Sequence, residues 1–243
     1  MLINTTGIIL RSVKYSETSL ILDIFTRDFG LMTFIVSGAR KKNTASGAAL
    51  FQISNVVEIV AYNRDTSKIN RIKEVKISRV FNKLSMEIHR FSIAIFILEV
   101  LSKTLKEKEA NSELFDFIEN SLLYIDQCPG KTNNIHLTVL CKMCRYMGFF
   151  PENNFSAEYL FFDLREGKFI KYKPYHDDYL DENDSILMTE LISTDIENSD
   201  KLQFIKTTRQ RILDKLILYY KIHLTDFGRI KTLEVFKNIF SSA

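Results

Sequence analysis

Three consecutive cations, Arg40, Lys41 and Lys42, lie in a segment that separates two strand-like runs. This segment, from Ser37 to Gly47, is rich in small and turn-forming residues, which hold charged side chains away from a core and within reach of a polyanion. Lys and Arg side chains neutralise phosphate groups electrostatically, without a covalent step. We therefore predict a phosphate-binding loop, with an ordinary solvated surface loop as the alternative.

The elements that must position this loop are five runs rich in Ile, Val, Phe and Thr. They span residues 6–15, 19–26, 31–37, 49–62 and 68–78. Apolar positions alternate with positions such as Asp23 and Lys76, which is typical of strands with one face in a core. Turn residues at 28–30 and 63–65 allow antiparallel neighbours to pair directly. The pattern predicts a five-stranded OB-fold barrel in residues 1–80.

From Asn82 onward the apolar residues recur at spacings of three and four, which is typical of helices. Such stripes cover residues 84–105, 112–125, 134–147, 212–224 and 230–240, and Asn111-Ser112 is the expected cap of the second. Between them, residues 151–200 are aromatic and acidic, with a hairpin predicted around Glu166-Gly167. We expect an α+β multidomain chain, in which a helical domain over residues 81–243 carries residues 151–200 as an acidic insertion.

The net charge of +3 conceals a strong segregation of charge along the chain. Residues 1–80 hold 12 Lys and Arg against 6 Asp and Glu, residues 151–200 hold 4 against 13, and residues 201–243 hold 9 against 3. Basic ends favour a polyanionic partner, and the acidic stretch is expected to stay off the same surface. Around the barrel, the cations expected to assist the loop are Arg11, Lys14, Arg27, Lys68, Arg71 and Lys73.

Aromatic side chains on a barrel surface would stack on bases, and cations near the C-terminus would flank the path of a nucleic acid. The aromatic candidates are Phe25, Phe29, Phe51 and Tyr62, with burial in the core as the alternative because Phe is commonly buried. The C-terminal cations would otherwise form the polar face of a helical bundle. They are Lys206, Arg209, Arg211, Lys215, Lys221, Arg229, Lys231 and Lys237.

Motifs for catalysis are missing from the sequence. The glycines form no phosphate loop, and the histidines lie far apart without a hydrolase or metalloprotease motif. We predict no enzyme and no cofactor. Carboxylates over residues 177–184 lack the order of a calcium loop, so a solvated acidic loop is expected rather than a metal site.

A metal site is not expected at the cysteines either. Cys141 and Cys144 supply only one pair of thiols, with Cys128 or His136 as the only conceivable nearby ligands, whereas a structural zinc site needs four. We expect these thiols in a helical core. Three cysteines form no disulfide framework, which fits a reducing cytoplasm. No secretory signal is visible, and the most apolar stretch, residues 91–101, is too short to span a membrane.

Several segments, in this order, resemble the RecO recombination mediator proteins of bacterial DNA repair. They are Gly7-Ile8-Ile9-Leu10, Tyr15-Ser16-Glu17-Thr18-Ser19-Leu20, Thr26-Arg27-Asp28-Phe29-Gly30-Leu31, Ser37-Gly38-Ala39-Arg40, Met147-Gly148-Phe149-Phe150-Pro151, Tyr219-Tyr220-Lys221-Ile222-His223-Leu224 and Lys231-Thr232-Leu233. The resemblance covers nearly the whole chain. Many relatives carry a four-cysteine zinc module after the Gly-Phe-Phe-Pro-like stretch, whereas this chain has no cysteine beyond Cys144.

The resemblance implies a protein that binds single- and double-stranded DNA and anneals complementary strands. It also implies cooperation with RecR, a pocket for the C-terminal tail of single-strand-binding protein, an indirect role in loading RecA, and a cytoplasmic, nucleoid-associated location. Lys142 and Arg145 are the candidate rim of that pocket. Two alternatives stay open, an OB-fold protein adaptor and an RNA-binding module.

Overall fold

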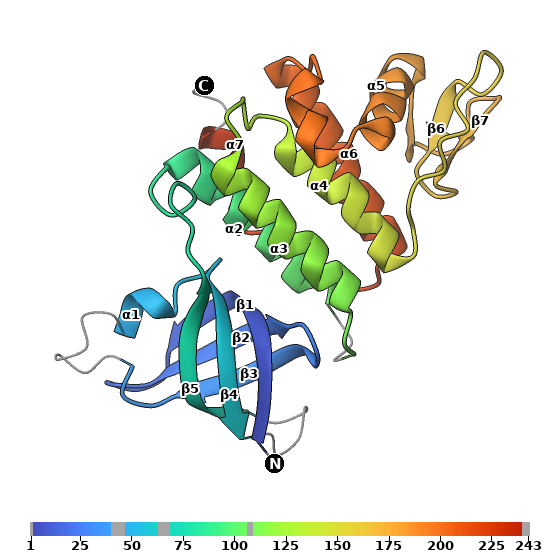
Figure 1. The fold of residues 1–243 in the computed structure, drawn as a ribbon. Coiled ribbons are helices and arrows are strands. Elements are labelled where there is room, and N and C mark those ends of the chain that lie inside the picture. The colour runs from blue at the N-terminus through green and yellow to red at the C-terminus, as the bar shows by residue number, and fades with distance from the viewer. Residues whose placement is uncertain (1, 40–46, 63–68, 106–108, 240–243) are drawn as a thin grey trace. The chain divides into compact units, whose positions relative to one another are not determined.

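The computed structural model describes residues 2–39, 47–62, 69–105 and 109–239, which form two compact units (Figure 1). The first unit comprises residues 1–87 and 105–126, and the second comprises residues 88–104 and 127–243. Helix α3 (Ser112–Gln127) thus packs almost entirely within the barrel unit. The division into functional domains at residue 80 stays a prediction.

The first unit is built on five strands that form a closed, hydrogen-bonded ring in the order β1-β2-β3-β5-β4. All neighbours are antiparallel except β3 and β5, which pair in parallel over a short stretch. The strands are β1 (Leu2–Lys14), β2 (Leu20–Thr26), β3 (Gly30–Val36), β4 (Val56–Tyr62) and β5 (Asn70–Arg79). The predicted α+β class with an N-terminal OB-type barrel is confirmed.

The barrel interior is filled by alternate residues of every strand. Leu22 and Ile24 of β2 are fully buried, and so are Phe34 of β3 and Ile59 of β4. Residues between them point outward, since successive strand side chains alternate between faces. This alternation allows the barrel to be predicted from the sequence.

The predicted strand over residues 49–62 is wrong in its first half. Residues Gly47–Leu50 form a short helix, α1, and β4 begins only at Val56. The Asn55 side chain donates hydrogen bonds to the carbonyls of Ala49 and Leu50, at 2.8 and 3.1 Å. These local side-chain bonds satisfy carbonyl groups at the end of α1.

The second unit is mainly helical, and the apolar stripes predict its helices with shifted boundaries. The stripe from residue 84 was expected to be helical throughout, but the helix begins at residue 88. Gly148, with φ of 81°, ends the segment that the sequence predicts over residues 134–147. The elements are α2 (Ile88–Thr104), α4 (Ile135–Met143), the 3₁₀ turn η1 (Cys144–Met147), α5 (Glu182–Ser193), the 3₁₀ turn η2 (Ile196–Lys201), α6 (Lys206–His223) and α7 (Thr232–Ile239).

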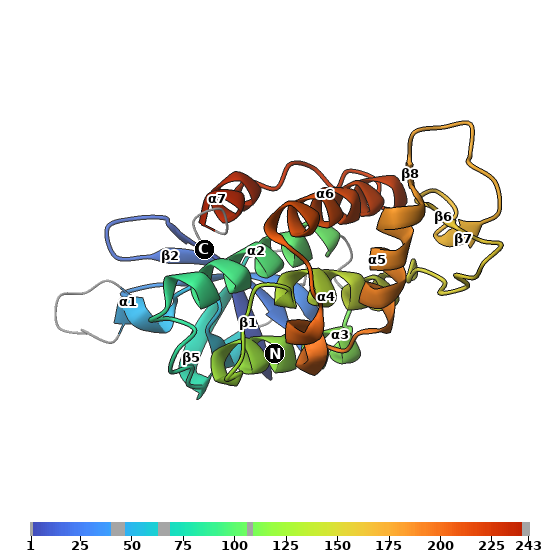
Figure 2. The same ribbon diagram turned by 90° about the horizontal axis from the view of Figure 1, so that it is seen from above.

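A small three-stranded sheet in the order β7-β6-β8 lies within the acidic segment (Figure 2). Its strands are β6 (Phe161–Asp163), β7 (Lys168–Ile170) and β8 (Tyr179–Leu180), so the predicted hairpin is confirmed. The expected acidic loop over residues 177–184 is wrong in part, because helix α5 starts there. The Asp181 side chain caps α5 by accepting a hydrogen bond from the Asp184 amide at 2.9 Å. Carboxylates are favourable at a helix N-terminus, which explains this acidic cluster.

Cys141 and Cys144 are buried in the helical unit, as predicted, and Cys128 is buried there too. Burial raises the pKa of the Cys141 thiol to about 12, which keeps the thiol neutral. Within the described ranges, no three His, Cys, Asp or Glu side chains are grouped so that they could hold a metal ion. None of the described helices is long and apolar enough to cross a membrane.

Candidate nucleic-acid interface

The cations predicted around the barrel fall into two classes, those that form an ion pair with a carboxylate of the protein and those that do not. Arg11 on β1 forms an ion pair with Asp23 on β2, whose second carboxylate oxygen accepts a hydrogen bond from Thr33 at 2.9 Å. Lys73 on β5 forms an ion pair with the adjacent Glu74 at 3.2 Å. Both cations are partly neutralised within the barrel surface itself.

Arg27 follows β2 and has a structural partner on α3. Its guanidinium donates two hydrogen bonds to the Asp116 carboxylate, at 2.9 and 2.8 Å. This contact raises the pKa of Arg27 and lowers the pKa of Asp116. Arg79 and Glu119 form a second ion pair of this kind, at 2.8 Å. Arg27 therefore helps to hold α3 against the barrel, a role that does not require DNA.

A groove of about 630 Å³ lies on the outer face of β1, β4 and β5. Its charged lining is balanced, because the Lys76 ammonium pairs with Glu58 at 2.7 Å and Lys73 pairs with Glu74. Such a lining offers no excess of positive charge to a polyanion. The groove is therefore a poor site for phosphates.

Lys14 and Arg71 differ from the other predicted cations. Both are exposed, and neither forms an ion pair with any residue that the structure describes. Lys14 ends β1, and Arg71 is the second residue of β5. They are the described barrel cations most available to a phosphate.

Arg71 belongs to a row of outward-facing residues that crosses all five strands, which we call the rim. The strand register links one residue to the next from Leu2, at the start of β1, through β4, β5, β3 and β2 to Val13, near the other end of β1. The rim residues are Leu2, Tyr62, Arg71, Ile35, Ile21 and Val13. Leu2, Tyr62 and Val13 are 47%, 45% and 40% exposed.

The central loop cations of the prediction, Arg40, Lys41 and Lys42, lie outside the described residues, and so does Lys68. The described residues beside these segments are neighbours of rim residues: Val36, which follows Ile35, ends β3, and Asn70, which precedes Arg71, begins β5 beside Phe34.

The aromatic candidates separate clearly by exposure. Phe25 and Phe51 are buried, and Phe25 packs against Phe115 of α3 with ring centroids 5.7 Å apart. Phe29 is partly buried against the barrel core. Tyr62 alone among the four is exposed. Burial, the alternative expected for the phenylalanines, therefore applies to Phe25 and Phe51.

The two residues predicted to border a peptide pocket, Lys142 and Arg145, have separate structural roles in the helical unit. The Lys142 ammonium donates to the carbonyl of Ile192 at 3.0 Å, near the C-terminus of α5, and pairs with Asp195 at 3.3 Å. Arg145 lies over the Phe150 ring at 4.5 Å from its centroid. Neither contact forms a pocket for an acidic peptide.

Several C-terminal cations also bind groups of their own unit. Arg211 pairs with Asp184 of α5, and Arg209 donates to the Phe204 carbonyl at 2.8 Å. Lys215 donates to the Tyr179 carbonyl at 2.9 Å. These three side chains therefore have structural roles within the helical unit.

The apolar part of the rim was missed by sequence reasoning. Ile21 lies on the outward side of the alternating pattern of β2, where a polar residue is expected, and this was the available signal. Which strand ends meet at the rim follows from the pairing register, which a single sequence does not specify.

The comparisons with known proteins cover nearly the whole chain. A family model described as "Recombination protein O N terminal" matches residues 1–81, and one described as "Recombination protein O C terminal" matches residues 86–233. Proteins named DNA repair protein RecO are 34% identical over 241 residues in Phocaeicola vulgatus and 35% identical over 243 residues in Flavobacterium psychrophilum. Both alignments cover 99% of this chain and 100% of the relative. The chain therefore belongs to the RecO family of DNA repair proteins.

Proposed function

We propose that this protein acts in recombinational DNA repair as a non-catalytic mediator that binds single- and double-stranded DNA. Family membership over both halves of the chain is the observation that carries this proposal. The OB strand order supports it, because barrels of this type present strands and loops to oligonucleotides. The charge segregation also supports it, since the barrel half is strongly basic.

At the rim, phosphates and bases would be bound by different side chains. Arg71 and Lys14, together with Arg40, Lys41 and Lys42, neutralise phosphates. The Tyr62 ring and the exposed aliphatic rim residues contact bases. None of these contacts reads the edge of a base pair, so binding is largely independent of sequence.

Annealing follows from the same electrostatics. Basic surfaces on both ends of the chain reduce the repulsion between two polyanionic strands and hold them together while they pair. Binding of RecR, capture of the tail of single-strand-binding protein and delivery of RecA to DNA complete the proposal, as does a place in the cytoplasm near the nucleoid. These finer steps rest on the family resemblance.

The test is fluorescence anisotropy with single-stranded DNA, duplex DNA and RNA across a salt series. Changing Arg40, Lys41 and Lys42 together to Ala should weaken DNA of every sequence alike. The slope of log affinity against log salt should become shallower by about two to three units, because each phosphate contact contributes roughly 0.7 to 0.9.

The matched control removes three lysines of the helical unit outside the basic C-terminal segment, Lys103, Lys131 and Lys168, and should leave the slope unchanged. A salt slope that stays the same in the loop variant rejects the loop. No DNA binding by the wild-type protein at low salt rejects the proposed function and favours an adaptor. Selective binding of RNA favours the RNA-binding alternative, since that selectivity needs the 2′-hydroxyl.

A further inference from the structure

The loop between β7 and β8, residues 171–178, displays two tyrosines that have little contact with the rest of the protein. Tyr172 is 75% exposed, and Tyr175 is exposed over its whole side chain. They alternate with lysines and a proline in the order Lys171-Tyr172-Lys173-Pro174-Tyr175. In Figure 2 this loop extends away from helices α5 and α6 of its own unit.

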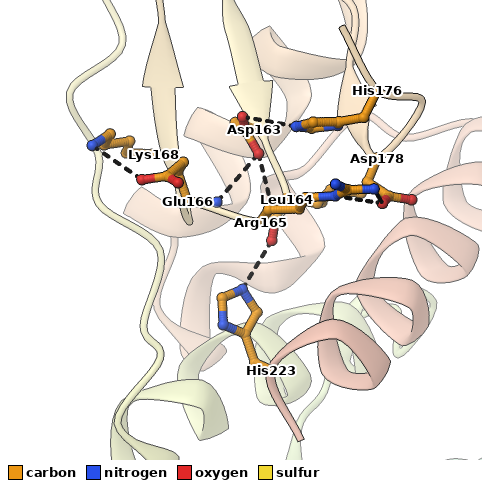
Figure 3. Close-up of polar contacts among 8 residues, drawn as sticks. All are labelled: Asp163, Leu164, Arg165, Glu166, Lys168, His176, Asp178 and His223. Atoms are coloured by element: carbon orange, nitrogen blue, oxygen red, sulfur yellow. Dashed lines mark hydrogen bonds and ion pairs between the residues drawn. The ribbon is translucent and has the colours of Figure 1, made fainter. Parts of the chain in front are cut away.

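The end of this loop is fixed to the β6–β7 turn by two pairs of side chains (Figure 3). His176 Nε2 lies 3.3 Å from one carboxylate oxygen of Asp163, whose other oxygen accepts the backbone N–H of Arg165 at 2.8 Å. The Arg165 guanidinium forms an ion pair with Asp178 at 2.7 Å. The loop therefore loses much of its conformational entropy when the protein folds rather than when a ligand binds.

The β6–β7 turn is itself fixed to helix α6. The Nε2 atom of His223 lies 2.9 Å from the carbonyl oxygen of Leu164. Gly167 has φ of 68°, and a Cβ atom there would lie only 2.6 Å from the Tyr219 hydroxyl oxygen. The turn therefore requires glycine, and the tyrosine loop is displayed from a rigid base.

Charges at the loop are nearly balanced although the surrounding segment is acidic. Lys171 pairs with Glu158 at 3.7 Å, and Arg165 neutralises Asp178. Lys173 lies 5.3 Å above the Tyr179 ring, and hydrogen bonding to Tyr179 raises its pKa, with a smaller contribution from Asp177. A ligand of this loop therefore gains more from contact with the rings than from net charge.

We propose that Tyr172 and Tyr175 form a stacking platform for the unpaired bases of single-stranded DNA, separate from the barrel rim. This inference rests on the proposed function and adds a second contact on the helical unit. Every base has a flat face, so exposed aromatic rings bind single strands without sequence preference. Paired bases are stacked on each other and offer no such face, so the platform selects single strands over duplex.

The experiment compares the full chain with Tyr172→Ala/Tyr175→Ala and Tyr172→Phe/Tyr175→Phe, using oligo(dT) and a duplex of equal length in a salt series. The alanine pair should weaken oligo(dT) binding at least about fivefold for each ring that stacks. Its salt slope and duplex affinity should stay at wild-type values. The phenylalanine pair should bind like the wild type, because it keeps both rings.

Tyr159→Ala is the matched control, since Tyr159 is 41% exposed in the same segment but outside the loop. Photo-cross-linking with a halogenated oligo(dU) should label Tyr172 or Tyr175. Unchanged oligo(dT) affinity in the alanine pair overturns the platform and assigns these tyrosines to a protein contact. DNA binding by the wild type and by the Arg40, Lys41 and Lys42 variant tests the proposed function without changing either tyrosine. Failure of the platform can therefore be distinguished from failure of the proposed function.

Discussion

Two surfaces of the barrel carry the same kinds of residue in different roles. At the surface that α3 covers, the aromatic Phe25 is buried against Phe115, and the cation Arg27 is bound to Asp116. At the rim, the aromatic Tyr62 is exposed, and Arg71 has no ion-pair partner among the described residues. Aromatic and cationic residues alone therefore do not mark a nucleic-acid site.

What separates the two surfaces is helix α3. It covers one of them and supplies both an apolar partner and a carboxylate, so the aromatic and the cation there contribute to folding. The exposed apolar side chains of the rim contribute to no core. The rim is therefore the barrel surface where a ligand is expected.

The largest effect that would test this comparison is on folding. Phe115 is 1% exposed, and Phe115→Ala should lower the free energy of unfolding by about 3–5 kcal/mol, because it removes a large buried ring and leaves a cavity. Urea denaturation followed by circular dichroism measures this. The rim control Leu2→Ala should change stability by less than about 1 kcal/mol. Equal stability of both variants would show that α3 does not cover the barrel as described.

The next effect is on DNA binding. Lys14→Ala/Arg71→Ala should weaken single-stranded DNA about 25-fold at 0.1 M salt, since each lost phosphate contact lowers the salt slope by roughly 0.7. Anisotropy in a salt series measures the affinity and the slope, which should fall by about 1.4.

The matched control for Lys14 and Arg71 is Arg27→Ala, which removes a cation at the surface that α3 covers. It should keep the wild-type salt slope, because its partner is Asp116 rather than a phosphate. A slope reduced equally by both variants would contradict the distinction between the two surfaces.

Much of the fold could be predicted from the sequence because its signals are local. Strand alternation and helical stripes come from neighbouring residues, and the Asn111 cap is confirmed by its hydrogen bond from the Leu114 amide at 2.9 Å. Helix α5 was missed because its capping Asp181 lies in a run of carboxylates that also fits a solvated loop.

The site was harder to predict because the partners of its cations are distant in sequence. Asp116 lies 89 residues from Arg27, and Ile192 lies 50 residues from Lys142. No spacing or composition signal reveals such pairs in a single sequence. Whether a cation is bound or available therefore becomes visible only in the folded chain.

A smaller effect is expected from the exposed aromatic of the rim. Tyr62→Ala should weaken single-stranded DNA at least about fivefold through lost stacking, while Tyr62→Phe should bind like the wild type. Stability should hardly change, because the ring is 45% exposed. Anisotropy with oligo(dT) measures the affinity. An equal loss in the phenylalanine variant would assign the effect to the hydroxyl group and reject stacking.

The smallest and most local effect concerns the Asp116 carboxyl on α3. Hydrogen bonds from Arg27 hold its pKa below the ordinary value. A carboxyl with a lowered pKa in the folded state stabilises that state above its unfolded pKa of about 3.9, and this contribution is lost as pH falls through the lower folded value. A carbon-13 titration of the carboxyl by NMR should show the lowered pKa in the wild type and a return toward the ordinary value in Arg27→Ala. The titration of Asp116 in Arg71→Ala should match the wild type, because the rim arginine has no part in this pair; a shift in that variant would show that the rim and the surface that α3 covers are electrostatically coupled.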